Sequence, residues 1–371
     1  MSSLRPDGGI YGLDYTPDQA KVILIPVPWE PTTSYGRGTA RGPAAILRAS
    51  HQVDLYDLQY GRVWEDGIAM LEVDPDIVRW NAEACAASEP VIAAGGFIEN
   101  DPELEARVAR VNVLSAKLNE RITAIARTWL ERGRIVGLVG GDHSCPYGTI
   151  AAHAERYPGL GILHIDAHAD LRNAFEGFTD SHASIFYNVA TRLPSVGPIV
   201  QVGLRDVCEE ELAFIEASRG RLVPFFDPVI GERLCDGEPF NAIADDIIKA
   251  LPRDVYVSFD IDGLDPSQGP HTGTPVPGGL TFRQVMALLT RLRRSGRRVV
   301  GFDLNEVAPG PSFHAGNGTK TLHGDEWDAN VGARILYKLI GLSRVTQLET
   351  SASASNAAQD RTGKALRSPR V

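Results

Sequence analysis

Short apolar runs of strand length alternate with amphipathic segments over most of this chain. The apolar runs cover residues 21–28, 134–140, 160–165, 198–204, 254–259 and 298–302. Helix-like periodicity follows at 209–219, 240–251, 282–295 and 327–342. Strands that are buried on both faces read as continuous apolar runs. The pattern therefore predicts an α/β fold: a three-layer sandwich with a mainly parallel sheet covered by helices on both faces.

One segment has the pattern of a long amphipathic helix, residues 102–132. Asp101 and Pro102 supply an N-cap and a first helical residue, and Gly133 ends the pattern. Apolar residues follow one another at steps of three and four, which is typical of a helix that packs on one face. We interpret this stripe as packing against the sheet or against another subunit.

The domain organisation predicted from the sequence is simple. We expect a single domain over residues 20–350, because no internal linker or change in composition divides it. Residues 64–100 have poor periodicity and are interpreted as an insertion with short helical pieces. Residues 1–19 are expected to form an N-terminal arm lying over this subunit or a neighbour, and residues 351–371 a polar C-terminal tail.

Composition narrows the function classes. The chain is 43% hydrophobic and 23% charged, as in soluble globular proteins, and its formal charge of −10 argues against nucleic-acid binding. No apolar run has the length of a signal peptide or a membrane span, so we expect a cytoplasmic protein with no membrane partner. Its four cysteines lie far apart, which indicates neither a disulfide framework nor a thiolate zinc site.

Acidic residues and histidines follow several of the apolar runs. They occur in Gly-Gly-Asp-His-Ser at 140–144, Asp-Ala-His-Ala-Asp at 166–170 and Asp-Ile-Asp at 260–262. The carboxyl ends of parallel strands lie along one sheet edge, so these side chains should converge. Buried carboxylates repel one another unless protons or cations neutralise them. Each motif alone could merely cap a neighbouring helix, but their joint occurrence favours a metal site.

These three motifs resemble the metal signatures of the ureohydrolase family, which includes arginases and agmatinases. The likeness covers roughly residues 20–345 and implies an arginase-like fold with two divalent ions, Mn²⁺ or Ni²⁺. By motif, one ion would be held by His143, Asp166, Asp170 and Asp260. The other would be held by Asp166, His168, Asp260 and Asp262.

The resemblance also implies how the site works. Two divalent ions would cancel four aspartate charges and make a bridging water nucleophilic enough to attack a guanidinium carbon. His182 matches the family histidine that passes a proton to the leaving amine, and Glu306 the glutamate that pairs with the guanidinium. Asp170 would orient the attacking hydroxide. The alternatives are a surface-loop role for His182 and a structural salt bridge for Glu306.

The sequence departs from arginases and ordinary agmatinases around this site. His182 is followed by Ala-Ser rather than Gly-Thr, and residues 173–181 lack the arrangement with which arginases hold an amino acid's carboxylate. Arginine is therefore not the expected substrate. Several loops look like those of the longer branch that contains guanidine hydrolase and metformin-cleaving relatives. The residues expected to form a substrate wall are Trp29, Phe178, Asp180 and Trp327.

The expected function is hydrolysis of a carbon–nitrogen bond in guanidine or a short guanidino or biguanide compound. The alternatives are a dimethylbiguanide (metformin) hydrolase subunit, an agmatinase or guanidinobutyrase, and a one-zinc deacetylase on a related fold. A non-catalytic alternative is a supporting subunit in a hetero-oligomer with a paralogous chain. Family resemblance implies a homotrimer or hexamer, and the sequence does not identify the substrate's tail.

Overall fold

The computed structural model of the chain describes residues 8–313 and 323–365. Within them an eight-stranded sheet has the order β2-β1-β3-β8-β7-β4-β5-β6, and every pair of neighbouring strands is parallel. The strands are β1 (Val22–Val27), β2 (Ile68–Met70), β3 (Ile135–Gly140), β4 (Gly161–Ile165), β5 (Ile199–Leu204), β6 (Leu222–Phe226), β7 (Asp254–Asp260) and β8 (Arg298–Asn305).

All the strands expected from the apolar runs are present, and two more extend the sheet at its edges. The strand β2 has three residues, too few to give a pattern of its own. The strand β6 is only half-buried, because it has a neighbour on one side alone. Edge strands need less apolar sequence, which is why the pattern did not predict them.

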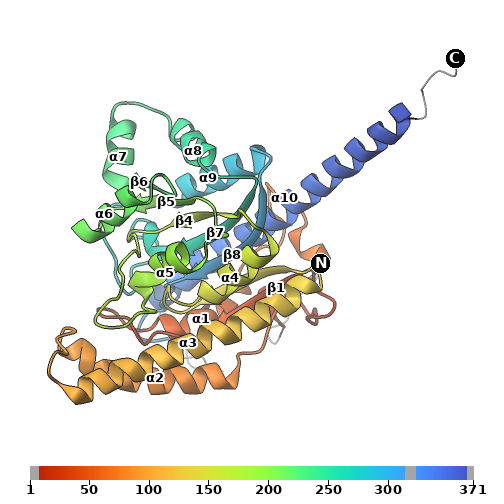
Figure 1. Cartoon of the computed structure of the whole chain (residues 1–371). Helices are drawn as coiled ribbons and strands as arrows, with labels where there is room; N and C mark the ends of the chain where they lie inside the picture. The colour runs from red at the N-terminus through yellow and green to blue at the C-terminus, as the bar shows by residue number, and fades with distance from the viewer. Residues whose placement is uncertain (1–7, 314–322, 366–371) are drawn as a thin grey trace.

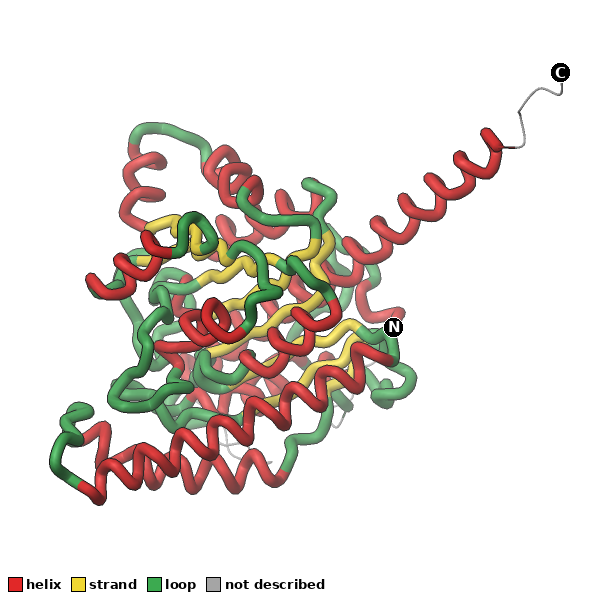
Figure 2. The backbone as a smooth tube through the Cα atoms, in the orientation of Figure 1, coloured by secondary structure: helices red, strands yellow, loops and turns green. Residues whose placement is uncertain are grey.

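Helices cover both faces of the sheet, as predicted for a three-layer α/β sandwich (Figures 1 and 2). Side chains from α1, α8, α9 and α10 share one large core with one face of the sheet, whereas α3, α4 and α5 contribute to cores on the other. The helices are α1 (Gly42–Ser50), α2 (Pro75–Ala93), α3 (Pro102–Glu131), α4 (Tyr147–Arg156), α5 (Ile185–Arg192), α6 (Glu209–Ala217), α7 (Asp227–Cys235), α8 (Phe240–Lys249), α9 (Phe282–Arg294) and α10 (Trp327–Ala365).

The predicted insertion forms a regular helix, which corrects the expectation of short helical pieces. Helix α2 has 19 residues, begins at the N-cap Asp74 and lies along α3 (Figure 1). Pro90 inside the helix and several alanines weaken its apolar stripe, so the sequence pattern missed it. The ion pair between Arg121 and Asp74, 2.7 Å long, joins the two helices at one end.

The N-terminal arm packs on its own subunit, which is one of the two placements expected for it, whereas the C-terminal helix is longer than expected. Ile10 and Tyr11 of the N-terminal arm are fully buried in the core of the same chain, where the Tyr11 hydroxyl donates to Ala333 O at 3.0 Å. Helix α10 continues past residue 350 to Ala365 and projects from the body of the molecule (Figure 1). Among the described helices, none combines the length and the apolar character needed to cross a membrane.

Candidate metal centre and active site

Four adjacent strands at the centre of the sheet carry the predicted site residues at their carboxyl ends. His143 follows β3, Glu306 follows β8, Asp260 ends β7, and the segment Asp166–Asp170 follows β4. These strands are neighbours in the order β3-β8-β7-β4 although they are far apart in the sequence. The topology therefore brings the predicted residues to one edge of the sheet, where open α/β sheets bind their ligands.

His143 is buried and faces three carboxylates. Its Nδ1 atom lies 2.9 Å from Asp166 Oδ2, 3.3 Å from Asp170 Oδ2 and 3.1 Å from Asp260 Oδ2. Its Nε2 atom lies 3.0 Å from Ser258 Oγ, and Ser258 donates to Asp303 Oδ1 at 2.9 Å. Because Ser258 uses its hydrogen on Asp303, it accepts from Nε2–H of His143, which directs Nδ1 toward the carboxylates.

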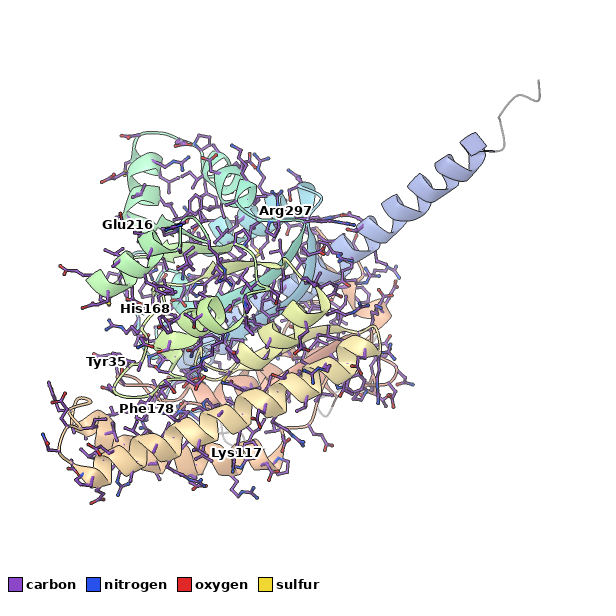
Figure 3. The ribbon with its side chains drawn as sticks, in the orientation of Figure 1. Tyr35, Lys117, His168, Phe178, Glu216 and Arg297 are labelled. Carbon is purple, nitrogen blue, oxygen red and sulfur yellow. The ribbon has the colours of Figure 1, made fainter. Side chains whose placement is uncertain are left out.

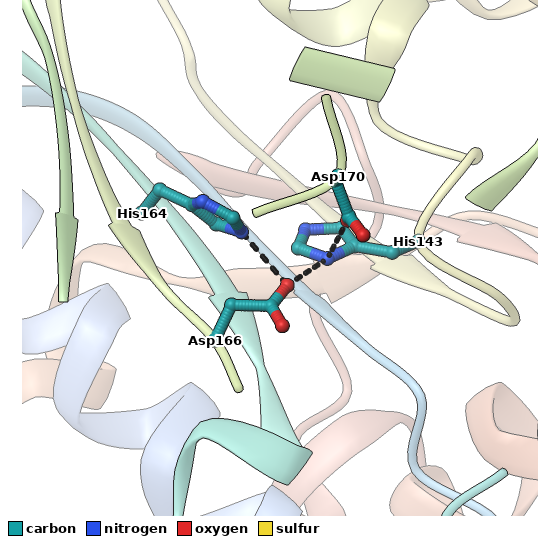
Figure 4. Close-up of side chains that lie close together, drawn as sticks. All are labelled: His143, His164, Asp166 and Asp170. Atoms are coloured by element: carbon teal, nitrogen blue, oxygen red, sulfur yellow. Dashed lines mark hydrogen bonds and ion pairs between the residues drawn. The ribbon is translucent and has the colours of Figure 1, made fainter. Parts of the chain in front are cut away.

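Asp166 joins two groups of potential metal ligands. In one group, candidate ligand atoms of Asp166, His143, His164 and Asp170 lie within 4.8 Å of one another. In the other, the same holds for Asp166, His168 and Asp262, and His168 Nδ1 is 3.1 Å from Asp262 Oδ2. Figure 4 shows His143 and His164 approaching Asp166 from different sides, with Asp170 beside His143.

The electrostatics of this cluster fit a cation. Burial, followed by the neighbouring Asp166, raises the pKa of Asp170 to about 7. Burial, Asp262 and Asp166 together raise the pKa of Asp260 well above its usual range. Asp170 Oδ2 also accepts no hydrogen bond from the described residues. Carboxylates held this close without enough donors are stabilised by divalent ions, and mixed imidazole and carboxylate donors suit transition metals such as Mn²⁺.

Two residues at this edge of the sheet, one in the cluster and one beside it, have strained backbones. Asp170 has a φ of +55° and Glu306 a φ of +60°, in the left-handed region that residues other than glycine rarely adopt. The backbone carbonyl of Asp170 accepts from Phe186 N and Tyr187 N at the start of α5, which holds this conformation in place. Such strain is typical of functional positions that the surrounding structure determines.

Glu306 presents one free carboxylate oxygen to the site. Its Oε1 accepts from the backbone N–H of His143 at 2.9 Å, whereas its buried Oε2 has no hydrogen-bond partner among the described residues. Burial and the nearby Asp142 raise the pKa of Glu306 well above its usual range. A cationic ligand with N–H donors would satisfy this oxygen and favour the ionised carboxylate.

His182 lies at the start of a short 3₁₀ helix, His182–Ser184, on the loop that leaves the Asp166–Asp170 motif. Its Nδ1 is 3.1 Å from Thr32 Oγ1, and the ring of Phe175 stands perpendicular to it with centroids 5.9 Å apart. Burial, His168 and His143 lower the pKa of His182 to about 4, so the ring is neutral at pH 7. Sequence reasoning did not identify Thr32 as its partner, although both belong to loops at the same sheet edge.

Two of the predicted wall residues are core residues, which corrects that expectation. Trp29 is fully buried among apolar side chains that include Leu114 and Leu118 of α3. Phe178 is fully buried in a small core that it shares with Val91 of α2 and Val108 of α3. Figure 3 shows Phe178 beside α3. Neither ring exposes a face to a ligand in this structure, so cation–π contacts with a substrate are not available to them.

The other two wall candidates also have structural partners. Asp180 is mostly buried and pairs with Arg192 at 2.9 Å and with Asn119 at 3.2 Å. Trp327 donates from its indole nitrogen to Ser267 O and lines a cavity of about 860 Å³ between α9 and α10. None of the clustered histidines and carboxylates is among the described residues that line this cavity. Trp327 therefore lines a cavity that the clustered histidines and carboxylates do not line.

The loop between the motif and His182 is shaped by α3. Asn112 of α3 donates to Gly177 O at 3.2 Å and accepts from Thr179 N at 3.0 Å, so it bonds the loop on both sides of Phe178. This anchoring places the ring of Phe175 beside the ring of His182. The loop's conformation thus depends on the helix pair α2–α3, a dependence that the sequence pattern did not reveal.

The fold and the cluster together define a class: an α/β protein with a parallel sheet whose central strand ends carry a histidine and aspartate cluster able to bind metal. The sequence profile of the Arginase family matches residues 20–324. The chain belongs to the Arginase family, whose members are ureohydrolases. It is accordingly a metal-dependent hydrolase that acts on carbon–nitrogen bonds of amidino groups.

Individual relatives agree with this assignment. The chain is 35% identical over 335 residues to an N(1)-aminopropylagmatine ureohydrolase of Thermus thermophilus, covering 90% of this chain and 94% of the relative. It is 26% identical to an agmatinase of Bacillus anthracis, over 79% and 85% of the two chains. The solved structure of an agmatine ureohydrolase of Thermoplasma volcanium matches with a TM-score of 0.65, 21% identity and coverage of 90% and 94%, which supports the fold.

Proposed function

We propose that this chain is a two-metal ureohydrolase that cleaves a small guanidino compound into urea and an amine. The observation that carries the proposal is Asp166, whose carboxylate belongs to both groups of potential ligands. In the proposed assignment, His143, Asp166, Asp170 and Asp260 hold one ion. The residues Asp166, His168, Asp260 and Asp262 hold the other. Two divalent ions, Mn²⁺ or Ni²⁺, would supply a nucleophile at neutral pH by lowering the pKa of water.

The residues around the cluster have complementary tasks. Glu306 binds the guanidinium through its free Oε2 atom while its Oε1 stays on the His143 backbone. Asp170 Oδ2 accepts a hydrogen bond from the attacking water and orients it. His182, neutral at pH 7 and held by Thr32, takes up a proton and delivers it to the leaving amine.

For the substrate, we propose a guanidino group on an amine-bearing chain, of which agmatine is a simple example. The relative with 35% identity over nearly its whole length carries the name N(1)-aminopropylagmatine ureohydrolase. The preference for guanidine or dimethylbiguanide rested on loops that look like those of the guanidine- and metformin-cleaving branch, with Trp29, Phe178 or Trp327 offering cation–π contacts in a narrowed pocket. Trp29 and Phe178 are buried in the core, so their cation–π contacts no longer favour the shorter compounds.

A substrate panel tests this proposal. Purified protein loaded with Mn²⁺, and separately with Ni²⁺, is assayed for urea release from agmatine, N(1)-aminopropylagmatine, guanidine, 4-guanidinobutyrate, arginine and dimethylbiguanide. We expect the amine-bearing guanidines to give the highest kcat/KM. Preferential turnover of guanidine or dimethylbiguanide would overturn the substrate assignment and leave the reaction class in place. Activity that requires a second gene product would instead support the supporting-subunit alternative.

A further inference from the structure

His164, one of the potential metal ligands, lies side by side with Gln201. His164 belongs to β4 and Gln201 to β5, and the two residues are paired in register. Both side chains are fully buried, and both interrupt otherwise apolar strands. Residues in register on neighbouring strands point to the same face of a sheet. The pairing therefore brings the amide of Gln201 against the imidazole of His164.

The surroundings of Gln201 determine which way its amide points. Its Nε2 atom is 2.7 Å from Ala169 O and 3.0 Å from His164 Nδ1. A backbone carbonyl only accepts hydrogen bonds, so the reversed amide would bring two oxygens into contact. The other amide atom, Oε1, has no hydrogen-bond partner among the described residues, so nothing there favours the reversed orientation.

The amide of Gln201 in turn determines the tautomer of His164. One N–H of Gln201 is used on Ala169 O, and the second points at His164 Nδ1, which must accept it. A neutral imidazole with an accepting Nδ1 carries its proton on Nε2. That Nε2 atom is 2.8 Å from Asp166 Oδ2, so His164 donates to this carboxylate. The ring of Phe186, with centroids 3.8 Å apart, packs on the imidazole and holds its plane.

We propose that Gln201 and His164 are positioning residues that orient the Asp166 carboxylate between the two metal positions, and that His164 is not itself a metal ligand. Asp166 Oδ2 accepts from His164, and Asp166 Oδ1 accepts from the backbone N–H of His168 at 2.6 Å. Each oxygen is thus fixed by one protein donor and keeps lone pairs for a cation. His143 differs, because its Nδ1 is free to face the carboxylates.

This inference rests on the metal centre of the proposed function, and metal binding by apo protein tests it without an activity assay. Isothermal titration calorimetry with Mn²⁺ gives affinity and stoichiometry, and the visible spectrum of the Co²⁺-loaded protein reports the ligand set. Gln201→Glu replaces the amide donor with an acceptor, which favours the His164 tautomer that carries its proton on Nδ1. In that tautomer the Nε2 lone pair of His164 faces Asp166 and repels its carboxylate. We expect Mn²⁺ affinity to fall roughly 10- to 100-fold, as when other partners of metal ligands are changed.

Two substitutions of His164 distinguish a role as hydrogen-bond donor to Asp166 from a role as metal ligand. His164→Gln keeps an N–H that can reach Asp166, so we expect two Mn²⁺ sites with affinity close to that of the wild type. His164→Leu removes the donor and should lose affinity as Gln201→Glu does. If His164 is a ligand, both substitutions will lose affinity equally and change the Co²⁺ spectrum alike. This pair also decides the question if Gln201→Glu fails to fold.

A matched control is Ser343→Ala. Ser343 is fully buried on α10 and donates to Val299 O at 2.9 Å, away from the strand ends that carry the cluster. Its loss should lower stability and leave Mn²⁺ affinity unchanged. Wild-type affinity in Gln201→Glu would overturn the positioning role. A wild-type protein that binds fewer than two Mn²⁺ ions would instead contradict the proposed two-metal function, so the two failures are distinguishable.

Discussion

Asn112 ties the loop beside His182 to helix α3, and its replacement gives a quantitative test of this dependence. Asn112→Ala removes the hydrogen bonds to Gly177 O and from Thr179 N. Each is worth about 0.5–1.5 kcal/mol net, so the anchored loop should lose about 1–3 kcal/mol. Because this loop brings Phe175 to His182, the loss lowers kcat/KM by at most roughly 5- to 150-fold if only the anchored loop is productive.

The assay is urea release by Mn²⁺-loaded protein, with the metal content of each variant measured in parallel. Asn112→Asp keeps the acceptor for Thr179 N and loses the donor to Gly177 O, so it should fall between the wild type and Asn112→Ala. Val113→Ala, at the neighbouring and half-exposed position, is the control and should be neutral. An unchanged kcat/KM in Asn112→Ala at full metal content would refute the reasoning, as would an equal loss in Val113→Ala.

Three further predictions concern the cluster and its neighbours. Glu306→Gln should keep the hydrogen bond from His143 N but lose the charge that binds the guanidinium. Since a hydrogen bond to a charged group contributes about 1.5–3 kcal/mol, kcat/KM should fall roughly 10- to 150-fold. Unchanged kinetics would contradict guanidinium binding by Glu306. Thr32→Val removes the shorter of the two hydrogen bonds of His182 Nδ1 and should lower kcat about tenfold at constant Mn²⁺ affinity. Steady-state kinetics and metal titration measure the two effects. In metal-free protein, Asp262 and Asp166 outweigh the opposing effect of burial and raise the pKa of His168 to about 12. The folded state then keeps a proton that the unfolded state loses above its pKa of about 6.5, so the free energy of unfolding should fall from pH 7 to 9 by about 1.4 kcal/mol per pH unit for this proton. Urea denaturation should show a smaller slope in Mn²⁺-loaded protein, and equal slopes with and without metal would contradict metal binding at His168.

The sequence predicted the centre of the molecule well, because each central strand and the motif that follows it are neighbours in the chain. The buried strands β3, β4, β7 and β8 read as apolar runs, and the metal-binding motifs directly follow them. Once the strands are parallel and adjacent, their carboxyl ends meet without further assumptions. The resemblance to ureohydrolases then supplied roles for residues that the geometry brings together, such as His143 and Asp166.

The surroundings of the site could not be predicted in the same way, because they depend on contacts between distant segments. Phe178 was expected to face a substrate, but it packs in a small core with residues of α2 and α3. The sequence did not predict this core, because Pro90 and the alanines obscure the helical pattern of α2. The pairing of His164 with Gln201 left a weaker signal, a single polar residue within each apolar strand. The contact between the two residues follows only from the register of β4 and β5, which the sequence does not give.

The central claim is that two metal ions share Asp166 and together activate the hydrolysis of a guanidino group. Its most direct test is a titration of metal-free protein with Mn²⁺ in which urea release from agmatine and bound metal are measured on the same samples. We predict that activity saturates at two ions per chain, and that Asp166→Asn weakens both sites and abolishes urea release. Saturation at one ion per chain, or retention of one tight site and full activity in Asp166→Asn, would contradict the account.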